Sequence, residues 1–168
     1  MLKEKILQNL NTALKEKKEL ELSVLRMLSA AINNRETEKR TKLWKGKPDL
    51  SSEDLEKESK LTDEEVAEVV FAEAKKRKES IEGFQKGNRQ ELAEKEKKEL
   101  EMLKKYLPEQ LSQEQIKKLV QEAISKVGAK EMRDMGKVMQ ELMPKVKGKA
   151  DGVLVSKVVK ESLESSMN

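Results

Sequence analysis

The segment LTDEEVAEVVFAEAKKRKESIEGFQKG, residues 61–87, carries the signals of a single long helix. Thr62 and Glu65 stand three positions apart, as in a capping box, and predict where the helix begins. Gly87 interrupts the pattern and predicts where it ends. Between these signals, apolar residues recur at helical spacing: Val66, Val70, Ala74, Ile81 and Phe84. The segment therefore predicts a helix that packs through one apolar stripe.

The same periodicity extends toward the N-terminus, where it predicts helices over residues 2–17 and 20–40. Residues 44–60, WKGKPDLSSEDLEKESK, break the pattern with Gly46, Pro48 and a pair of serines. Because such residues mark turns, we expect a loop or a poorly ordered insert between helices there.

The chain continues toward the C-terminus as further helical segments. Apolar spacing predicts a helix over residues 88–107 that ends at Pro108. Ser112 and Gln115 form another capping-box pattern and Gly128 suits a helix end, so a helix is expected between them. A further helix over residues 132–143 is expected to close at Pro144, and a last one to start near Asp151. Only 2% of the residues are aromatic, so the core must consist of aliphatic side chains, Met and Ala, which suit helix packing. The predicted fold class is all-α.

The segment YLPEQLS, residues 106–112, is the predicted boundary between two domains. We expect an N-terminal helical bundle over residues 1–108 and a smaller C-terminal helical domain over residues 109–168. The first part carries 25 basic and 23 acidic side chains, and the second carries 11 and 9. Each part has only a small positive excess, so a surface that binds nucleic acid must be a local patch.

The residue types that are absent exclude several kinds of site. The chain of 168 residues has no Cys and no His, which excludes thiol catalysis, a Ser-His-Asp triad and the usual structural zinc site. The seven glycines form no nucleotide-binding fingerprint, and we predict no cofactor and no metal. No stretch approaches the roughly 20 apolar residues of a membrane span, and no signal peptide precedes the first helix. We expect a cytoplasmic protein without a membrane partner.

The segment DMGKVMQELMPKVKGKADG, residues 134–152, departs from the pattern of charged helix. After Pro144, lysines alternate around a glycine, and the next helix is expected to begin directly behind them. Amides at a helix N-terminus attract anions, and nearby lysines favour phosphate. The predicted residues that bind phosphate or RNA are Lys137, Lys145, Lys147, Gly148, Lys149, Asp151 and Gly152. The alternative is a loop with solvated lysines.

Two other cationic segments are secondary candidates. The first, KKRK, consists of Lys75, Lys76, Arg77 and Lys78. Consecutive helical residues point about 100° apart, so the alternative is that the lysines are solvated and Arg77 pairs with a carboxylate at the edge of the core. The second, KRTKLWKGK at residues 39–47, has five basic residues, no acid and the only Trp. It can contact single-stranded nucleic acid, or its Trp can pack against the rest of the protein.

Half of the eight methionines form one stripe at helical spacing: Met132, Met135, Met139 and Met143. Core packing is the ordinary role of such a stripe. The alternative is a groove that docks a helix of a partner protein. Gly136 lies inside the same helix, where a glycine costs roughly 1 kcal/mol of helix stability. A close approach of another backbone would explain why a glycine stands at this position.

Four segments, taken together, resemble the YqeY family, the GatB/YqeY group. They are LRMLSAAIN (residues 25–33), KKRKESIEGFQKGNRQELAEKE (75–96), YLPEQLS (106–112) and the segment at 134–152. The C-terminal part is similar to the tail domain of the B subunit of the glutamine-dependent aspartyl/glutamyl-tRNA amidotransferase. In that enzyme the tail is associated with tRNA recognition, and the chemistry lies in other domains. The resemblance implies a two-part helical protein linked to this carbon–nitrogen ligase, which takes its amide nitrogen from glutamine, and it supplies no catalytic residues.

These observations predict an accessory protein that binds tRNA or another structured RNA through its C-terminal domain. The resemblance implies an amidotransferase or a tRNA-synthetase complex as its setting. The alternative function is that of a protein–protein adapter which docks a partner through the methionine stripe. An enzyme that acts alone would need a catalytic pocket, and the sequence offers no constellation of residues for one.

Overall fold

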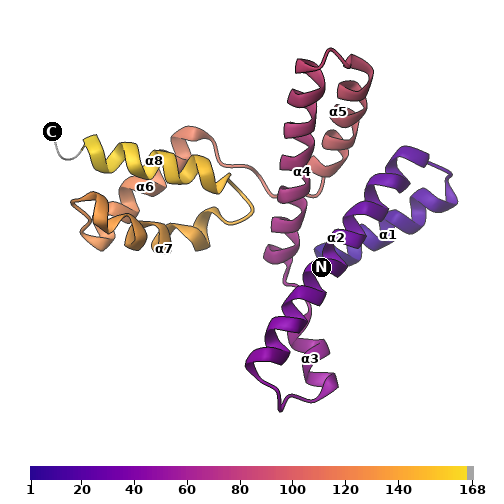
Figure 1. Ribbon diagram of the computed structural model, residues 1–168, viewed down its shortest axis with the longest axis horizontal. Helices are drawn as coiled ribbons and strands as arrows, with labels where there is room; N and C mark the ends of the chain where they lie inside the picture. The colour runs from indigo at the N-terminus through magenta and orange to yellow at the C-terminus, as the bar shows by residue number, and fades with distance from the viewer. Residues whose placement is uncertain (166–168) are drawn as a thin grey trace. The chain divides into compact units, whose positions relative to one another are not determined.

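The computed structural model describes residues 1–165, and this range contains helices and turns but no β-strand (Figure 1). The fold class is all-α, as predicted. The elements are α1 (Leu2–Lys15), α2 (Glu19–Gly46), α3 (Ser52–Ser59), α4 (Asp63–Lys86), α5 (Gln90–Lys104), α6 (Gln113–Val127), the short 3-10 helix η1 (Met132–Asp134), α7 (Met135–Val146) and α8 (Gly152–Ser165). Within the same range, no helix combines the length and the apolar character that a membrane span requires.

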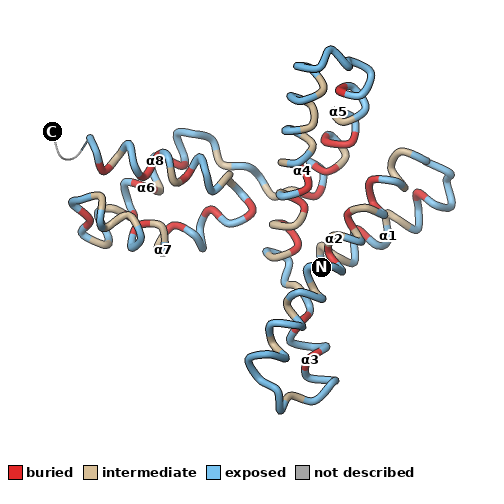
Figure 2. The backbone as a smooth tube through the Cα atoms, in the orientation of Figure 1, coloured by how far each residue is buried: buried red, intermediate tan, exposed pale blue. Residues whose placement is uncertain are grey.

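The described helices group into two compact units, and the change from one to the other falls between Leu107 and Pro108. The first unit contains α1 to α5, and the second contains α6 to α8. Each unit has its own cluster of buried apolar side chains (Figure 2). That the units are separable domains stays a prediction.

The core of the first unit is formed by aliphatic side chains from four helices. α1 runs beside the first part of α2, α4 pairs with α5, and α3 packs against the later part of α2 (Figure 1). Four fully buried side chains from these helices are Ile6, Leu28, Val70 and Leu103. Burial of each contributes about 1.5–3 kcal/mol. Tyr106 is also buried in this core, and its hydroxyl accepts a hydrogen bond of 2.7 Å from the side-chain amide nitrogen of Asn9.

Helix α4 begins and ends where the sequence predicts. The amide of Glu65 donates to the Thr62 hydroxyl at 3.3 Å, and the amide of Thr62 donates to the Glu65 carboxylate at 2.8 Å. These reciprocal bonds form the predicted capping box, which satisfies two amides that the helix leaves free. Gly87 follows the last helical residue.

The prediction of a loop or insert at residues 44–60 is wrong. Helix α2 continues to Gly46, and Ser52–Ser59 form the separate helix α3. The Ser51 hydroxyl accepts a hydrogen bond of 3.1 Å from the amide of Asp54 and thus caps α3, while Leu55 is buried. Glycine and serine break helices when they lie inside them, but here they stand at helix ends, and only residues 47–51 remain as a connection.

The second unit contains α6, η1, α7 and α8, and both ends of α6 lie where the sequence predicts. The amide of Gln115 donates to the Ser112 hydroxyl at 3.2 Å, and the reciprocal bond completes the capping box of α6. Gly128 ends α6 with a left-handed φ of 64°, a conformation that favours glycine. The core of the unit includes one fully buried side chain from each α-helix: Val120, Leu142 and Leu163.

The methionine stripe belongs mainly to this core. Met132, Met135 and Met139 pack against the buried cluster, whereas Met143 is 41% exposed. The prediction that the helix closes at Pro144 is wrong, because α7 runs on to Val146. Pro144 has no amide hydrogen and therefore makes no bond to the carbonyl of Gln140. Gln140 is exposed, so water can reach that carbonyl.

The expectation of a close backbone approach at Gly136 is also wrong. A Cβ atom placed on Gly136 would meet no other atom within 4 Å, and the residue is exposed. The structure gives no packing reason for a glycine at this position.

Candidate nucleic-acid interface

The turn between α7 and α8 carries most of the predicted phosphate-binding residues. Val146 is buried at the end of α7, and Gly148 follows with a φ of 70° while also being buried. The amides of Lys149 and Ala150 both donate to the carbonyl of Val146, at 2.9 and 3.0 Å. Because an L-residue with a side chain is strained at this φ, Gly148 is required for the turn to take this path.

Two residues outside the predicted site hold this turn in place. The side-chain amide of Gln110 donates to the carbonyl of Gly148 at 3.1 Å, and the backbone amide of Leu111 donates to the carbonyl of Lys149 at 2.8 Å. Both lie just before α6, about 38 residues away along the chain. No periodicity or motif connects segments so far apart, so the sequence carried no signal for these contacts.

The three lysines at this turn are Lys145, in the last turn of α7, and Lys147 and Lys149, in the connection to α8, and all three are exposed. The ammonium of Lys145 lies 3.9 Å from the carboxylate of Glu141, at the edge of ion-pair distance. In the described part of the chain, no carboxylate lies within ion-pair distance of Lys149. The turn thus presents cationic side chains on a backbone that is fixed by hydrogen bonds, which suits contact with phosphate oxygens.

The start of α8 is less open to an anion than the sequence suggests. The Asp151 carboxylate accepts a hydrogen bond of 2.8 Å from the amide of Val153 and so acts as the N-cap of the helix. Gly152 is exposed, and a Cβ placed there would meet nothing within 4 Å. Since one helical amide is already bound to a carboxylate, the lysines must supply most of the attraction for a phosphate at this site.

Lys137 lies apart from the turn. Its ammonium donates to the Asp134 carboxylate at 3.0 Å, at the beginning of α7. Eight residues separate it from Lys145, which corresponds to about 12 Å along a helix axis. The hydrogen bond from Lys137 is the largest cause that lowers the pKa of Asp134 below its ordinary value of 3.8, followed by the bond from the amide of Lys130. Lys137 is therefore engaged in the structure of η1 and α7.

Glu141 lies on α7 between Lys137 and the lysines at the turn. Lys126 on α6 donates to it at 2.6 Å. Lys145, which lies on α7 like Glu141 itself, approaches it to 3.9 Å. The hydrogen bond from Lys126 is the main cause that lowers the pKa of Glu141. The ionised carboxylate offsets part of the positive charge on this face, so the cationic character is highest at the turn.

The KKRK cluster lies on α4 in the first unit and does not form a single cationic face. Arg77 Nε lies 2.9 Å from the Glu99 carboxylate and 3.4 Å from that of Glu96, and the guanidinium also contacts the sulfur of Met27. Lys76 donates to the buried Glu73 at 2.6 Å, Lys75 is half-buried, and Lys78 is exposed. Arg77 thus takes the structural role, in an ion pair at the edge of the core.

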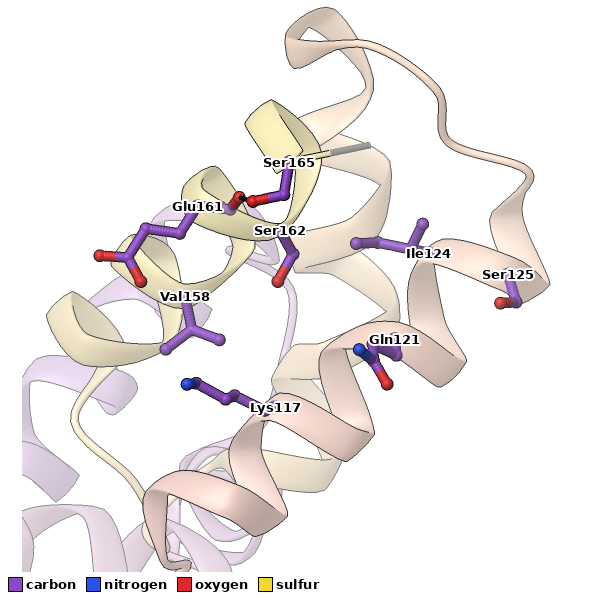
Figure 3. Close-up of a pocket in the computed structure, with 8 residues that line it drawn as sticks. All are labelled: Lys117, Gln121, Ile124, Ser125, Val158, Glu161, Ser162 and Ser165. Carbon is purple, nitrogen blue, oxygen red and sulfur yellow. Dashed lines mark hydrogen bonds between the residues drawn. The ribbon is translucent and has the colours of Figure 1, made fainter. Parts of the chain in front are cut away.

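A groove of about 590 Å³ lies between α6 and α8 (Figure 3). Among the side chains that line it, Lys117 and Glu161 are the titratable ones, and Figure 3 shows Lys117 directed toward Val158. A single lysine and a single glutamate on an open surface do not form an enclosed acid–base pair. No cluster of three or more Asp or Glu side chains that could hold a metal ion occurs within residues 1–165.

Comparison with protein families identifies the chain through most of its length. The family model described as Yqey-like protein matches residues 43–163. The chain belongs to the YqeY-like family. No curated protein matches the chain.

The match to the YqeY-like family includes the turn between α7 and α8 and the whole of α3. Residues 52–59 therefore lie within the part of the chain that the family model matches. The segment LRMLSAAIN lies before the matched range, so the family assignment rests on the remaining three segments and the sequence around them.

Proposed function

We propose that this member of the YqeY-like family binds structured RNA, such as tRNA, through the turn between α7 and α8. The observation that carries the proposal is the set of three exposed lysines at the end of α7 and on the following turn, which Gly148 shapes and Gln110 holds. A preordered turn loses little conformational freedom when it binds, which favours affinity. Lysines act as point charges, so the contact positions the RNA backbone and discriminates little between bases.

In this proposal the protein is accessory rather than catalytic. It holds an RNA while a partner enzyme carries out the chemistry, as the likeness to the tail of the tRNA amidotransferase suggests. An amidotransferase or a tRNA synthetase that acts on the same RNA is the proposed setting. The groove between α6 and α8 lacks a paired acid and base, which supports an accessory role.

The second candidate function is that of an adapter between proteins. A groove that docks a helix needs several apolar side chains free on one face. Three of the four methionines of the stripe are packed against the core of the second unit, which leaves Met143 for a partner. We therefore place RNA binding first.

The decisive experiment is a titration of tRNA at several salt concentrations. The parent is compared with a variant in which Lys145, Lys147 and Lys149 are changed to alanine. If each lysine neutralises one phosphate, the slope of log affinity against log salt becomes shallower by roughly 2–3 units. The helices remain intact because these side chains are exposed.

A matched control changes three other exposed lysines of the second unit, Lys118, Lys157 and Lys160, to alanine. This control removes the same charge away from the turn, and we expect it to keep most of the parental slope. Equal slopes for the parent and the turn variant would refute the interface. Absence of tRNA binding by the parent would favour the adapter function.

A further inference from the structure

Trp44, the only tryptophan of the chain, lies on the surface of the first unit. It is part of α2, two residues before the helix ends, and it is 56% exposed. The alternative that it packs against the rest of the protein is therefore wrong. The exposed part of the indole is therefore open to a ligand.

The residues around Trp44 are cationic. Arg40 precedes it by four positions and therefore lies on the same face of α2, and Lys45 follows it directly. Within the described residues, no carboxylate lies within ion-pair distance of Arg40, Lys42 or Lys45. The cations at the two ends of the segment differ, because Lys39 pairs with Glu65 at 2.8 Å and Lys47 pairs with Glu58 at 3.2 Å.

A groove of about 420 Å³ runs beside this part of α2. Four cations line it, Arg35, Lys39, Lys42 and Lys47, together with the single carboxylate of Glu65. Arg35, Lys39 and Lys47 each pair with a carboxylate, so Lys42 is the cation of this groove that remains for a polyanion among the described residues. Lys42 stands two positions before Trp44, so this groove lies on the other side of α2 from the indole.

Neither the helix dipole nor apolar docking accounts for these residues as well as nucleic acid does. Cations in the last turn of a helix favour its dipole, but this effect gives no role to an exposed Trp. Insertion into a membrane surface or docking of a protein requires a stripe of exposed apolar side chains. Trp44 is the only large apolar side chain of α2 that is exposed, and α2 lies entirely within the described residues.

We propose that the C-terminal half of α2 binds single-stranded nucleic acid, with a base stacked on the indole of Trp44. Backbone phosphates contact Arg40 and Lys45 beside the stacked base, and a strand that continues around the helix reaches the groove at Lys42. Stacking tolerates any base because every base offers a flat face. This site lies in the first unit and does not depend on the lysines of the turn between α7 and α8, so it extends the RNA-binding proposal with a second, independent contact.

The test uses the fluorescence of Trp44 in the full chain. The probe is a single-stranded thymidine oligonucleotide of roughly 12 nucleotides, within the site sizes of known single-strand binders. Because no other Trp is present, quenching reports this surface alone. We expect saturable quenching that weakens with salt. Inorganic polyphosphate, which has charge but no bases, should bind without comparable quenching.

Variants then separate stacking from charge. Binding is measured by fluorescence anisotropy with a labelled oligonucleotide. Trp44→Ala should weaken binding roughly 10-fold, because removal of an aromatic side chain that stacks on a base typically lowers affinity by about this factor. A variant with Arg40, Lys42 and Lys45 changed to alanine should weaken binding and flatten the salt dependence by roughly 2 units. The matched control changes three exposed cations, Lys78 on α4, Arg89 just before α5 and Lys95 on α5, and should keep the parental affinity.

The outcomes distinguish this site from the turn between α7 and α8. The variant lacking Lys145, Lys147 and Lys149 should show the parental quenching, whatever its affinity for tRNA. Absence of quenching in the parent, or equal oligonucleotide affinity for Trp44→Ala and the parent, would overturn the proposal. A shift of Trp44 emission with vesicles of phosphatidylserine and phosphatidylcholine, without a response to the oligonucleotide, would replace it with a membrane-surface site.

Discussion

Arg77 stands at the edge of the first core, where one cation faces two carboxylates. Its side chain is 16% exposed, and those of Glu96 and Glu99 are 18% and 10% exposed. Removal of the cation leaves partly buried carboxylates without their partner, which costs more than the loss of a surface pair. We expect Arg77→Ala to lower the free energy of unfolding by roughly 2–3 kcal/mol, measured by urea denaturation.

The neighbouring Lys78 provides the control for this prediction. It is exposed, so Lys78→Ala removes the same charge from the same helix but should change stability by less than about 0.5 kcal/mol. Comparable losses for the two variants would mean that net charge, and not the ion pair, determines the effect.

Two glycines of the second unit should respond to alanine in opposite directions. Gly136 is exposed in α7 with open space at its Cβ position, so Gly136→Ala should stabilise the protein by about 0.5–1 kcal/mol. Gly128 has a φ of 64°, so Gly128→Ala should destabilise it by about 1 kcal/mol although space is available there as well. Thermal denaturation of both variants checks the pair. A gain at Gly128 would contradict the left-handed helix end.

At the scale of elements, the junction of η1 and α7 depends on an ionised carboxylate. Asp134 accepts hydrogen bonds from the ammonium of Lys137 at 3.0 Å and from the amide of Lys130 at 3.2 Å. These bonds lower the pKa of Asp134 in the folded protein below 3.8. The stability they contribute is therefore present above the pKa of the unfolded chain and is lost as the pH falls through the folded-state pKa.

This linkage predicts how Asp134→Asn changes the dependence of stability on pH. The variant should be less stable than the parent at neutral pH, and the difference should shrink as the pH falls below 3.8. Urea midpoints over a pH series provide the measurement. Glu164→Gln, which removes one charge from α8, serves as the control. A difference between Asp134→Asn and the parent that stays constant at acidic pH would show that the carboxylate charge is not involved.

Residues 44–60, which have the composition of one loop, form the end of α2, a short connection and α3. Gly46 ends the first helix, and Ser51 caps the second with a hydrogen bond from Asp54. Leu55 then anchors α3 through burial of its side chain. The exposed connection is consequently limited to residues 47–51.

For the whole molecule, limited proteolysis tests the two-unit organisation. Exposed segments outside helices are cleaved first, so we expect early cuts in residues 105–112 and 47–51, identified by mass spectrometry of the fragments. If the units are separable domains, the fragment that starts near Pro108 should keep a helical circular dichroism spectrum, because it has its own core. Early cleavage within α4 or α5, or a fragment without helical signal, would argue against separable domains.

The sequence by itself determined the features that depend on neighbouring residues. The capping boxes at Thr62 and Ser112 and the left-handed Gly128 were all predictable, because each involves groups within about four positions of one another. The all-α class followed from apolar spacing and from a composition almost without aromatic residues. The segment at 44–60 was misjudged because Gly46 and Ser51 stand at helix ends, where such residues are favoured. Pro144 was misjudged because α7 continues two residues beyond it.

Only the tertiary structure decided which residues meet across the chain. Arg77 lies against Glu99 from the next helix, and Gln110 holds Gly148 across 38 residues. The tertiary structure also leaves Trp44 exposed to solvent and places most of the methionine stripe in the core. Apolar periodicity shows that a face is buried, but not what covers it. The partners of each face depend on how helices pack, and that is set by side-chain shapes over the whole unit rather than by local sequence.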